Sequence, residues 1–384
     1  MTHMRLHPVT ATPAATAVFT TVLTHGPISR RDIAKITGLS SAAVTQVARP
    51  ILEAGYLDEL PSDGRTGARL GRPVAPLAVR ADREHFVGVK ITETELIVVL
   101  TDLRAQVRSA RHLPLATKDV PAVVEAVAQV VTDLAGGGEQ THCLGISVAG
   151  DVDQASGLVR YSPFMGWQDV PLADLAATAT GLTVTVENDV NALAVAEQWF
   201  GEGVGTTTFA VMTVGVGIGC GLVINGALVT GGYGVAGEIG HIPVSASGPA
   251  CYCGGRGCLE AIASEPAIVT QARAVTRDMG LDLPGAVDLA HAGHPAVREV
   301  FAIAGRAIGR GLAAMVNLVG PEKVVVTGEG LAAYDLFEEH IRETFTAQAF
   351  GAAGKCPLVI RPLPFEEWAR GAAAVSLQRL FTSR

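Results

Sequence analysis

The stretch Gly237–Glu260, GEIGHIPVSASGPACYCGGRGCLE, carries the strongest chemical pattern in the 384-residue chain. His241 precedes Cys251, Cys253 and Cys258 in the spacing H-x9-C-x-C-x4-C. One imidazole and three thiolates form the usual donor set of a structural, tetrahedral zinc site. The glycines among these donors allow turns sharp enough for three sulfurs to converge. The pattern predicts structural zinc, and the alternative is three buried thiols beside an unrelated histidine.

Two glutamates, Glu238 and Glu260, flank these four residues, which we call the zinc knot, and neither is needed as a metal ligand. The pattern G-E-x-G-H followed by C-x-C-G-x-x-G-C-x-E resembles the signature of the ROK family, which comprises sugar-responsive repressors and sugar kinases. The resemblance extends over nearly the whole chain. It implies that His241 and the three cysteines hold zinc, and that Glu238, His241 and Glu260 face a bound sugar.

Charge is unevenly distributed along the chain. Residues 1–85 carry ten Lys or Arg against seven Asp or Glu, whereas the remainder carries 19 against 30, which gives the net charge of −8. We call residues 1–85 the head and the remainder the body. A basic head on an acidic body predicts a polyanionic partner for the head alone. The length allows two or three domains.

The sequence predicts a cytoplasmic protein with no membrane segment. The first 26 residues lack the apolar core of a secretory signal. The uncharged run Phe209–Val229 contains five glycines, which favours two strands and a turn over a membrane span. Cys143, Cys220 and Cys356 are far apart in sequence, and we expect reduced core thiols.

The head has the pattern of a helix-turn-helix. Helices are predicted at residues 14–24 and 30–37 and after Ser40, separated by short turns. The third helix presents a polar face that we expect to enter the major groove of DNA. Pro50 is expected to kink or shorten the end of this helix. The proposed DNA-contacting residues of this face are Ser41, Thr45, Gln46 and Arg49.

Residues 56–79 predict two short strands around a glycine-rich basic loop. Arg65, Arg69 and Arg72 in this loop are typical of a wing that contacts phosphate or the minor groove. The alternative is a helical bundle with a solvated basic loop. Regulators of the ROK family carry a winged helix in this position, so the resemblance implies a winged helix-turn-helix over residues 1–82. The expected partner is a double-stranded DNA operator, bound by a homodimer or homotetramer because paired recognition helices match two half-sites.

Residues 85–384 alternate strands and helices in two similar halves, which predicts a two-lobed α/β body with a ligand cleft. The resemblance implies the actin-like (ribonuclease H-like) fold of the sugar-kinase superfamily. We expect lobe 1 over 85–198, lobe 2 with the zinc knot over 199–370, and a C-terminal helix within 371–384 that packs back on lobe 1. The predicted strands are 86–91, 96–101, 107–113, 143–148, 183–186, 207–213, 219–224 and 323–327, and the predicted helices are 121–134, 190–199, 295–318, 334–350 and 371–380.

The segment Val186–Asn191, VENDVN, is predicted to end a strand and begin a helix, where α/β sheets bind ligands. Asn188 and Asp189 together offer a donor and acceptors for vicinal hydroxyls, and the alternative is a helix N-cap. The segment resembles the E-N-D-x-N motif of the ROK family. In its kinases, the aspartate at the position of Asp189 takes the proton of the attacking sugar hydroxyl.

Two phosphate motifs of the family kinases are altered. Where the kinases have D-x-G-G-T, this chain has Lys90-Ile91-Thr92-Glu93-Thr94, so a lysine replaces the aspartate, and Thr92 and Glu93 replace both glycines. Where they have G-T-G-x-G, Val216 replaces the threonine. Glu93 would repel phosphate, although Lys90 could pair with it. We therefore expect sugar binding without kinase activity.

One difference from the kinases concerns a segment that is expected to contact the sugar. Phe164 stands where the kinases often place a polar contact in A-P-N-L-G-W, and Trp167 is either a lid or a core residue. The sequence predicts a regulator that responds to a sugar or sugar phosphate. The alternatives are an active ROK sugar kinase with a DNA-binding head and a regulator whose body only dimerises.

Overall fold

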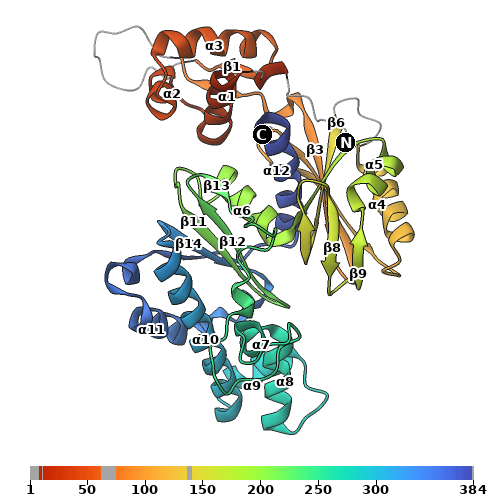
Figure 1. Cartoon of the computed structure of the whole chain (residues 1–384), viewed down its shortest axis with the longest axis vertical. Coiled ribbons are helices and arrows are strands. Elements are labelled where there is room, and N and C mark those ends of the chain that lie inside the picture. Colours follow the sequence, from red (N-terminus) through yellow and green to blue (C-terminus); the bar gives the residue numbers. More distant parts are fainter. Residues whose placement is uncertain (1–7, 11, 62–74, 136–140, 383–384) are drawn as a thin grey trace. The chain divides into compact units, whose positions relative to one another are not determined.

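The computed structural model describes residues 8–10, 12–61, 75–135 and 141–382 (Figure 1). The chain divides into two compact units, unit 1 (1–204 and 366–384) and unit 2 (205–365). These limits lie a few residues from the predicted lobe limits at 198/199 and 370/371.

The head begins with three helices, of which the second and third are joined by a short turn. Ser29 and Ser40 cap α2 and α3 by accepting the backbone N–H groups of Asp32 and Ala43. The helix α3 continues through Pro50, so the predicted shortening is wrong. Pro50 removes one backbone donor near the helix end, while Ile51, only 1% exposed, anchors the last turn in the core. The elements are α1 (Pro13–His25), α2 (Arg30–Thr37), α3 (Ser41–Glu53) and the antiparallel pair β1 (Leu57–Glu59) and β2 (Leu77–Val79).

The body of unit 1 is built on a five-stranded sheet of order β10-β6-β3-β4-β5. Its strands are β3 (His85–Ile91), β4 (Glu95–Asp102), β5 (Val107–Pro114), β6 (Thr141–Val148) and β10 (Thr183–Asn188). The helices α4 (Val120–Ala135), α5 (Leu172–Thr180) and α6 (Asp189–Phe200) follow these strands in the chain. A three-stranded sheet, β7 (Asp151–Asp153), β8 (Leu158–Ser162) and β9 (Trp167–Val170), was not predicted.

Unit 2 repeats the same sheet. Its order is β13-β12-β11-β14-β15, with two antiparallel pairings followed by two parallel ones, as in β5-β4-β3-β6-β10. The predicted duplication of an α/β lobe is therefore confirmed. The strands are β11 (Phe209–Val214), β12 (Ile218–Ile224), β13 (Ala227–Leu228), β14 (Lys323–Thr327) and β15 (Leu358–Ile360).

The helices of unit 2 pack around α10 (Pro295–Val319). This helix is long and apolar enough to cross a membrane, but most of its apolar stretch is buried inside the protein, so it is a core helix. The predicted helix at 334–350 is shorter than expected, because its first residues form a 3-10 helix. The other helices are η3 (Ile239–His241), α7 (Leu259–Ala263), α8 (Glu265–Thr276), α9 (Leu283–His291), η4 (Glu329–Leu336), α11 (Glu338–Gln348) and η5 (Gly351–Lys355).

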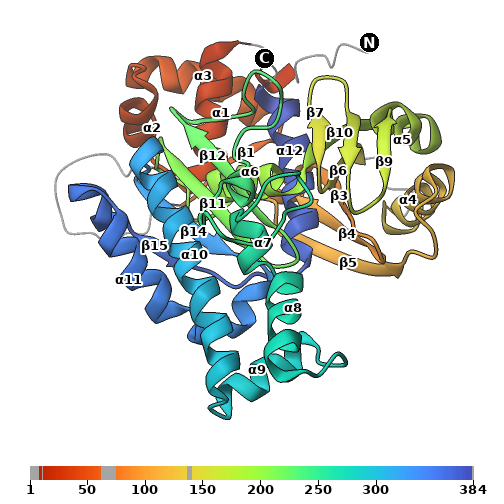
Figure 2. The same ribbon diagram turned by 60° about the horizontal axis from the view of Figure 1, so that its bottom comes forward.

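The C-terminal helix α12 (Glu366–Thr382) returns to unit 1 and lies against β3, β4, β6 and α6 (Figure 2). It begins five residues before the predicted start at 371. Two glycines of the sheet permit this close packing, since a Cβ on Gly88 or Gly145 would lie 2.0 or 1.9 Å from the carbonyl oxygen of Ala369 or Ala372.

The far end of α12 joins the core of the head. Phe381 is fully buried, and its ring centroid lies 4.7 Å from that of Phe19 on α1 and 6.3 Å from that of Tyr56. The hydroxyl of Tyr56 donates a hydrogen bond to Glu84, and burial and this carboxylate raise the pKa of Tyr56. The head and the sheet of unit 1 thus share one hydrophobic cluster.

Gly145→Ala should lower the stability of unit 1, because the added methyl group meets backbone that cannot rotate away. We expect a loss of about 1–3 kcal/mol, as for other overpacked cores. Gly232→Ala in unit 2 is the control, since its Cβ meets nothing within 4 Å. The midpoint of thermal unfolding measures both, and equal midpoints would contradict the packing described here.

Candidate functional site

The four residues of the zinc knot come together in unit 2. Nδ1 of His241 lies 3.6 Å from Sγ of Cys251, and Sγ of Cys253 lies 3.7 Å from Sγ of Cys258. All four donor atoms lie within 4.8 Å of one another. Zn–S bonds of about 2.3 Å and Zn–N bonds of about 2.0–2.1 Å at tetrahedral angles separate two sulfurs by about 3.75 Å and nitrogen from sulfur by about 3.55 Å. The donor set therefore fits zinc.

Tight turns bring these donors together. Gly257 has φ +69°, and a Cβ there would lie 1.8 Å from the carbonyl oxygen of Ser245. The backbone N–H of Gly255 lowers the pKa of the Cys253 thiol, whereas burial raises that of Cys258 to about 12. A divalent cation would supply the positive charge that holds such thiols ionised.

Three predicted sugar-side residues, Glu238, His241 and Glu260, also lie in unit 2. Glu260 is 8% exposed, and its Oε2 accepts the backbone N–H of Ile218 at 2.8 Å. The Nδ1 atom of His241 faces the zinc knot, which leaves Nε2 for a second partner. Nε2 lies beside the hydroxyl of Tyr252, and the contact of His241 with a sugar stays a prediction.

Tyr252 is a residue of this group that the sequence reasoning did not single out. Its hydroxyl lies 3.2 Å from Nε2 of His241, with the two rings edge to face. Burial, the charge and hydrogen bond of Glu260, and the charge of Glu238 raise its pKa. Its position between Cys251 and Cys253 was the available signal, because two ligands hold the backbone of the intervening residue close to the metal site.

Asn188 and Asp189 lie in unit 1 at the start of α6. The side chain of Asn188 caps this helix, accepting the N–H groups of Val190 and Asn191 at 3.0 and 3.1 Å and donating to the carbonyl of Gly150. The N-cap interpretation of Asn188 is therefore confirmed, while its contact with a ligand stays a prediction.

Lys90 forms a buried ion pair with Asp189, an arrangement the sequence did not predict. Nζ of Lys90 binds Oδ2 of Asp189, and the two residues are each 8% exposed. The ammonium also lies 5.4 Å from the ring centroid of Trp368 at the start of α12. The charge of Lys90 is thus directed to Asp189 rather than held free for a phosphate. Thr92 and Glu93 follow at the end of β3, and Glu93 pairs with Lys118.

The loop of residues 215–219, where the resemblance places the second kinase phosphate motif, has internal partners for most of its N–H groups. Val216 donates to Glu329 at 3.1 Å, and Ile218 donates to Glu260. Gly215 donates to the carbonyl of Gly217, and Gly219 to the hydroxyl of Thr213. Two of these four acceptors are carboxylates of the chain itself.

On the altered sugar-side segment, Trp167 is 4% exposed and donates from Nε1 to the carbonyl of Lys118, so it is a core residue rather than a lid. Phe164 is half-buried, and its carbonyl accepts Nζ of Lys118. The thiols of Cys143, Cys220 and Cys356 are free, as expected.

The polar face of α3 is exposed as predicted at Ser41, Thr45, Gln46 and Arg49. The guanidinium of Arg49 pairs with Glu53 one turn later at 2.8 Å. The proposed wing residues Arg65, Arg69 and Arg72 lie outside the described residues.

The duplicated sheet and the Cys3His cluster together define a two-lobed protein of the actin-like, sugar-kinase class. A model of the ROK family matches residues 86–379, and the chain belongs to this family.

Comparison with known proteins extends this similarity. The chain is 29% identical over 348 residues to the DNA-binding transcriptional dual regulator NagC of Escherichia coli (strain K12), covering 88% of this chain and 85% of NagC. It is 34% identical over 273 residues to a glucokinase of Thermotoga maritima, covering 67% of this chain and 86% of the glucokinase. The crystal structure of a ROK family transcriptional regulator, a homologue of the E. coli MLC protein, matches with a TM-score of 0.79 and 25% identity over 95% of both chains.

The matches to NagC and to the glucokinase cover different shares of this chain. Coverage of 88% corresponds to about 338 of the 384 residues, which is more than the 294 residues from 86 to 379. The similarity to NagC therefore reaches into the first 85 residues. Coverage of 67%, about 257 residues, fits within the ROK body alone.

Cys258→Ser should remove metal and lower stability together, because zinc bound only by the folded chain contributes folding free energy. We expect about one zinc per chain in freshly purified protein, and a loss of both zinc and several degrees of unfolding midpoint in the variant. Cys220→Ser, a buried thiol outside the knot, should keep its zinc. Mass spectrometry of the native protein and elemental analysis measure this, and native protein without zinc would refute the assignment.

Proposed function

We propose that this chain is a sugar-responsive transcriptional regulator of the ROK family that binds an operator in double-stranded DNA. The observation that carries the proposal is the similarity to NagC and to the MLC homologue, which includes the helical head. NagC is described as a DNA-binding regulator, and other relatives as N-acetylglucosamine and xylose repressors. The head has the helix order and the exposed polar face that such binding requires.

The DNA-binding proposal assigns α3 to the major groove. Ser41, Thr45, Gln46 and Arg49 are exposed on one face, and side chains of these types recognise bases and phosphates. The basic loop between β1 and β2, with Arg65, Arg69 and Arg72, is the proposed wing of a winged helix-turn-helix. Two half-sites need two heads, so we propose a homodimer or homotetramer, acting in the cytoplasm where the DNA lies.

The alternative function, an active sugar kinase with a DNA-binding head, meets two obstacles in the body. The kinase base position, Asp189, is already bound by Lys90. The N–H group of Val216, in the second phosphate loop, is bonded to Glu329. Phosphoryl transfer depends on positioning and charge stabilisation around the phosphates and their metal, and the carboxylate of Glu329 acts against both. We propose that the chain binds its sugar without phosphorylating it.

The proposed effector is a sugar or sugar phosphate contacted by Asn188, Asp189, Glu238, His241 and Glu260, with structural zinc holding His241 in place. Carboxylate, amide and imidazole groups accept and donate hydrogen bonds to hydroxyls. Tyr252 adds a phenol beside His241 and Glu260. The sugar contacts rest on the resemblance of these motifs to the family, and the zinc rests on the donor geometry.

Arg49→Ala should weaken operator binding by about 1–3 kcal/mol if the guanidinium contacts a base, since that is the usual value of a good bidentate contact. A DNA fragment selected by the full-length chain from a random library provides the operator, and fluorescence anisotropy at fixed salt measures affinity. A phosphate contact would instead weaken all sequences alike and reduce the salt dependence.

Arg342→Ala is the matched control for this measurement. Arg342 lies on α11 of unit 2 and, like Arg49, pairs at 2.8 Å with a glutamate four residues away. The substitution Arg342→Ala removes the same charge as Arg49→Ala but leaves the head unchanged. Equal losses of affinity in the two variants, or none in Arg49→Ala, would count against α3 as the recognition helix.

Glu238→Gln should abolish the effect of the sugar on DNA binding while leaving the DNA affinity of the sugar-free protein unchanged. An effector shifts DNA binding only through its different affinities for two conformations, so losing a sugar contact removes the response. Glucose, N-acetylglucosamine and xylose are the probes, with and without phosphate, and the selected DNA fragment reports the response.

Two further measurements complete this test. Glu339→Gln, an exposed glutamate of α11, should respond like the native chain. The same sugars are incubated with ATP and magnesium, and turnover at the ordinary kinase rate of about 1–100 per second would establish the kinase instead. Asp189→Asn is a poorer probe, because it leaves the buried Lys90 without its partner at a cost of about 3–5 kcal/mol.

A further inference from the structure

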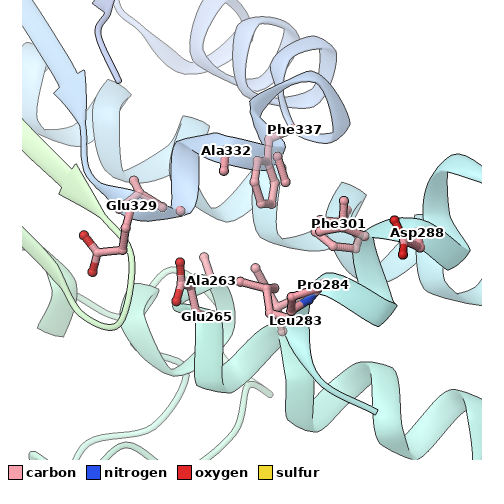
Figure 3. Close-up of a pocket in the computed structure, with 14 residues that line it drawn as sticks. Ala263, Glu265, Leu283, Pro284, Asp288, Phe301, Glu329, Ala332 and Phe337 are labelled. Carbon is pink, nitrogen blue, oxygen red and sulfur yellow. The ribbon is translucent and has the colours of Figure 1, made fainter. Parts of the chain in front are cut away.

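Unit 2 contains a cavity of about 290 Å³ that the proposed function does not use (Figure 3). It lies among α8, α9, α10 and η4, apart from the zinc knot residues, none of which lines it. Its volume suits a small organic molecule. The lining includes Glu265, Leu283, Asp288, Phe301, Glu329 and Phe337.

Most of this lining is apolar. Phe301 and Phe337 stand side by side in the middle of Figure 3, with ring centroids 5.4 Å apart, and Leu283 lies below them. Phe301 and Phe337 are themselves 1% and 2% exposed, so the cavity wall is part of the packed core. Such a wall favours a ligand with an aromatic or branched apolar body.

The charged groups of the lining are all acidic. Glu265 and Glu329 stand at one end of the cavity, and Asp288 lies beyond Phe301 at the other (Figure 3). Burial and the charge of Glu329 raise the pKa of Glu265. The carboxylate of Glu265 has no hydrogen-bond donor and no cationic partner among the described residues. Two neighbouring carboxylates without a counter-ion create a site of negative potential.

We propose that this cavity binds a small amphipathic amine, with its ammonium group between Glu265 and Glu329 and its apolar body against Phe301 and Phe337. An ammonium group carries three N–H donors. It can supply the hydrogen bonds that the carboxylate of Glu265 does not receive from the described residues. A phosphorylated ligand, by contrast, would be repelled, because all the charged groups that line the cavity are acidic.

An amine at this position would act on the neighbouring loop. Glu329 bonds the N–H of Val216, and the same loop bonds Glu260 through Ile218. A cation that draws the carboxylate of Glu329 into the cavity competes with the bond to Val216. The amine site is therefore joined through one loop to the sugar-side residue Glu260, although its occupancy does not depend on sugar binding.

The test uses the full-length chain and phenethylamine, an aromatic ring carrying an ammonium group. Its matched relatives are 2-phenylethanol, which is neutral, and phenylacetate, which is anionic. Isothermal titration at mildly alkaline pH, where Glu265 is ionised, should show saturable binding of the amine and a rise in unfolding midpoint. The neutral and anionic relatives should bind at least about 10-fold more weakly, a difference of about 1.4 kcal/mol.

Three variants locate the site. Glu265→Gln should weaken amine binding about 10-fold by removing the unpartnered carboxylate. Ala332→Trp, at an exposed position of the rim, should fill the cavity and abolish binding without disturbing the core. Glu343→Gln, an exposed glutamate of α11, removes the same charge elsewhere and should bind the amine like the native chain.

Three outcomes would overturn the proposal. The first is equal binding of phenethylamine and 2-phenylethanol, which would make the site merely apolar. The second is no saturable amine binding up to about 10 mM, which corresponds to less than about 3 kcal/mol. The third is binding of adenosine monophosphate that Ala332→Trp abolishes, which would make the cavity a nucleotide site. None of these outcomes bears on the DNA and sugar tests above.

Discussion

The close packing of α12 on the sheet of unit 1 is the contact on which the rest of that unit depends. Gly88 and Gly145 let the backbone of the helix approach the strands to a distance that any larger residue would prevent. With 17 residues at about 1.5 Å each, α12 spans about 25 Å. Its first turn places Trp368 over Lys90, and its last places Phe381 between Phe19 and Tyr56. One rigid helix therefore contacts both the Asp189 region and the core of the head.

This arrangement gives the proposed regulation a physical route within unit 1. A ligand that hydrogen-bonds Asp189 competes with Lys90, and Lys90 in turn contacts Trp368. A buried ion pair is weak evidence for stability, because desolvation offsets much of its attraction, but breaking it leaves a charge that must find a new partner. Packed helices often shift as whole bodies because interiors are dense, so we expect a displacement of Trp368 to move Phe381 as well. The aromatic contacts of Phe381 are where α12 meets the head.

The sequence predicted those features whose causes lie close together in the chain. The zinc knot donors fall within 18 residues, so their spacing alone indicated convergence, and the repeated strand pattern predicted the repeated sheet. The pair of Lys90 and Asp189 could not be found this way, because 99 residues separate its partners and only the parallel pairing of β3, β6 and β10 brings them together. Lys90 was read as the loss of a kinase aspartate, and its own partner was missed. The strands β7, β8, β9 and β15 and the helices α5, α7, α8 and α9 were also missed, and all of them except α8 have nine residues or fewer, so they offer little of a periodic pattern.

The phosphate loop of unit 2 shows how a binding surface is changed by the chain's own side chains. Backbone N–H groups in a glycine turn attract anions because each unpaired donor is costly to leave without a partner. Here Glu329 and Glu260 satisfy Val216 and Ile218, so the loop carries its own anions and is stable without a nucleotide. Glu329 faces both this loop and the neighbouring cavity, so one carboxylate satisfies a loop N–H group and makes the cavity wall acidic. A satisfied N–H group is not free to bind phosphate, and an acidic wall favours a cation. The same side chain therefore acts against one class of ligand and in favour of another.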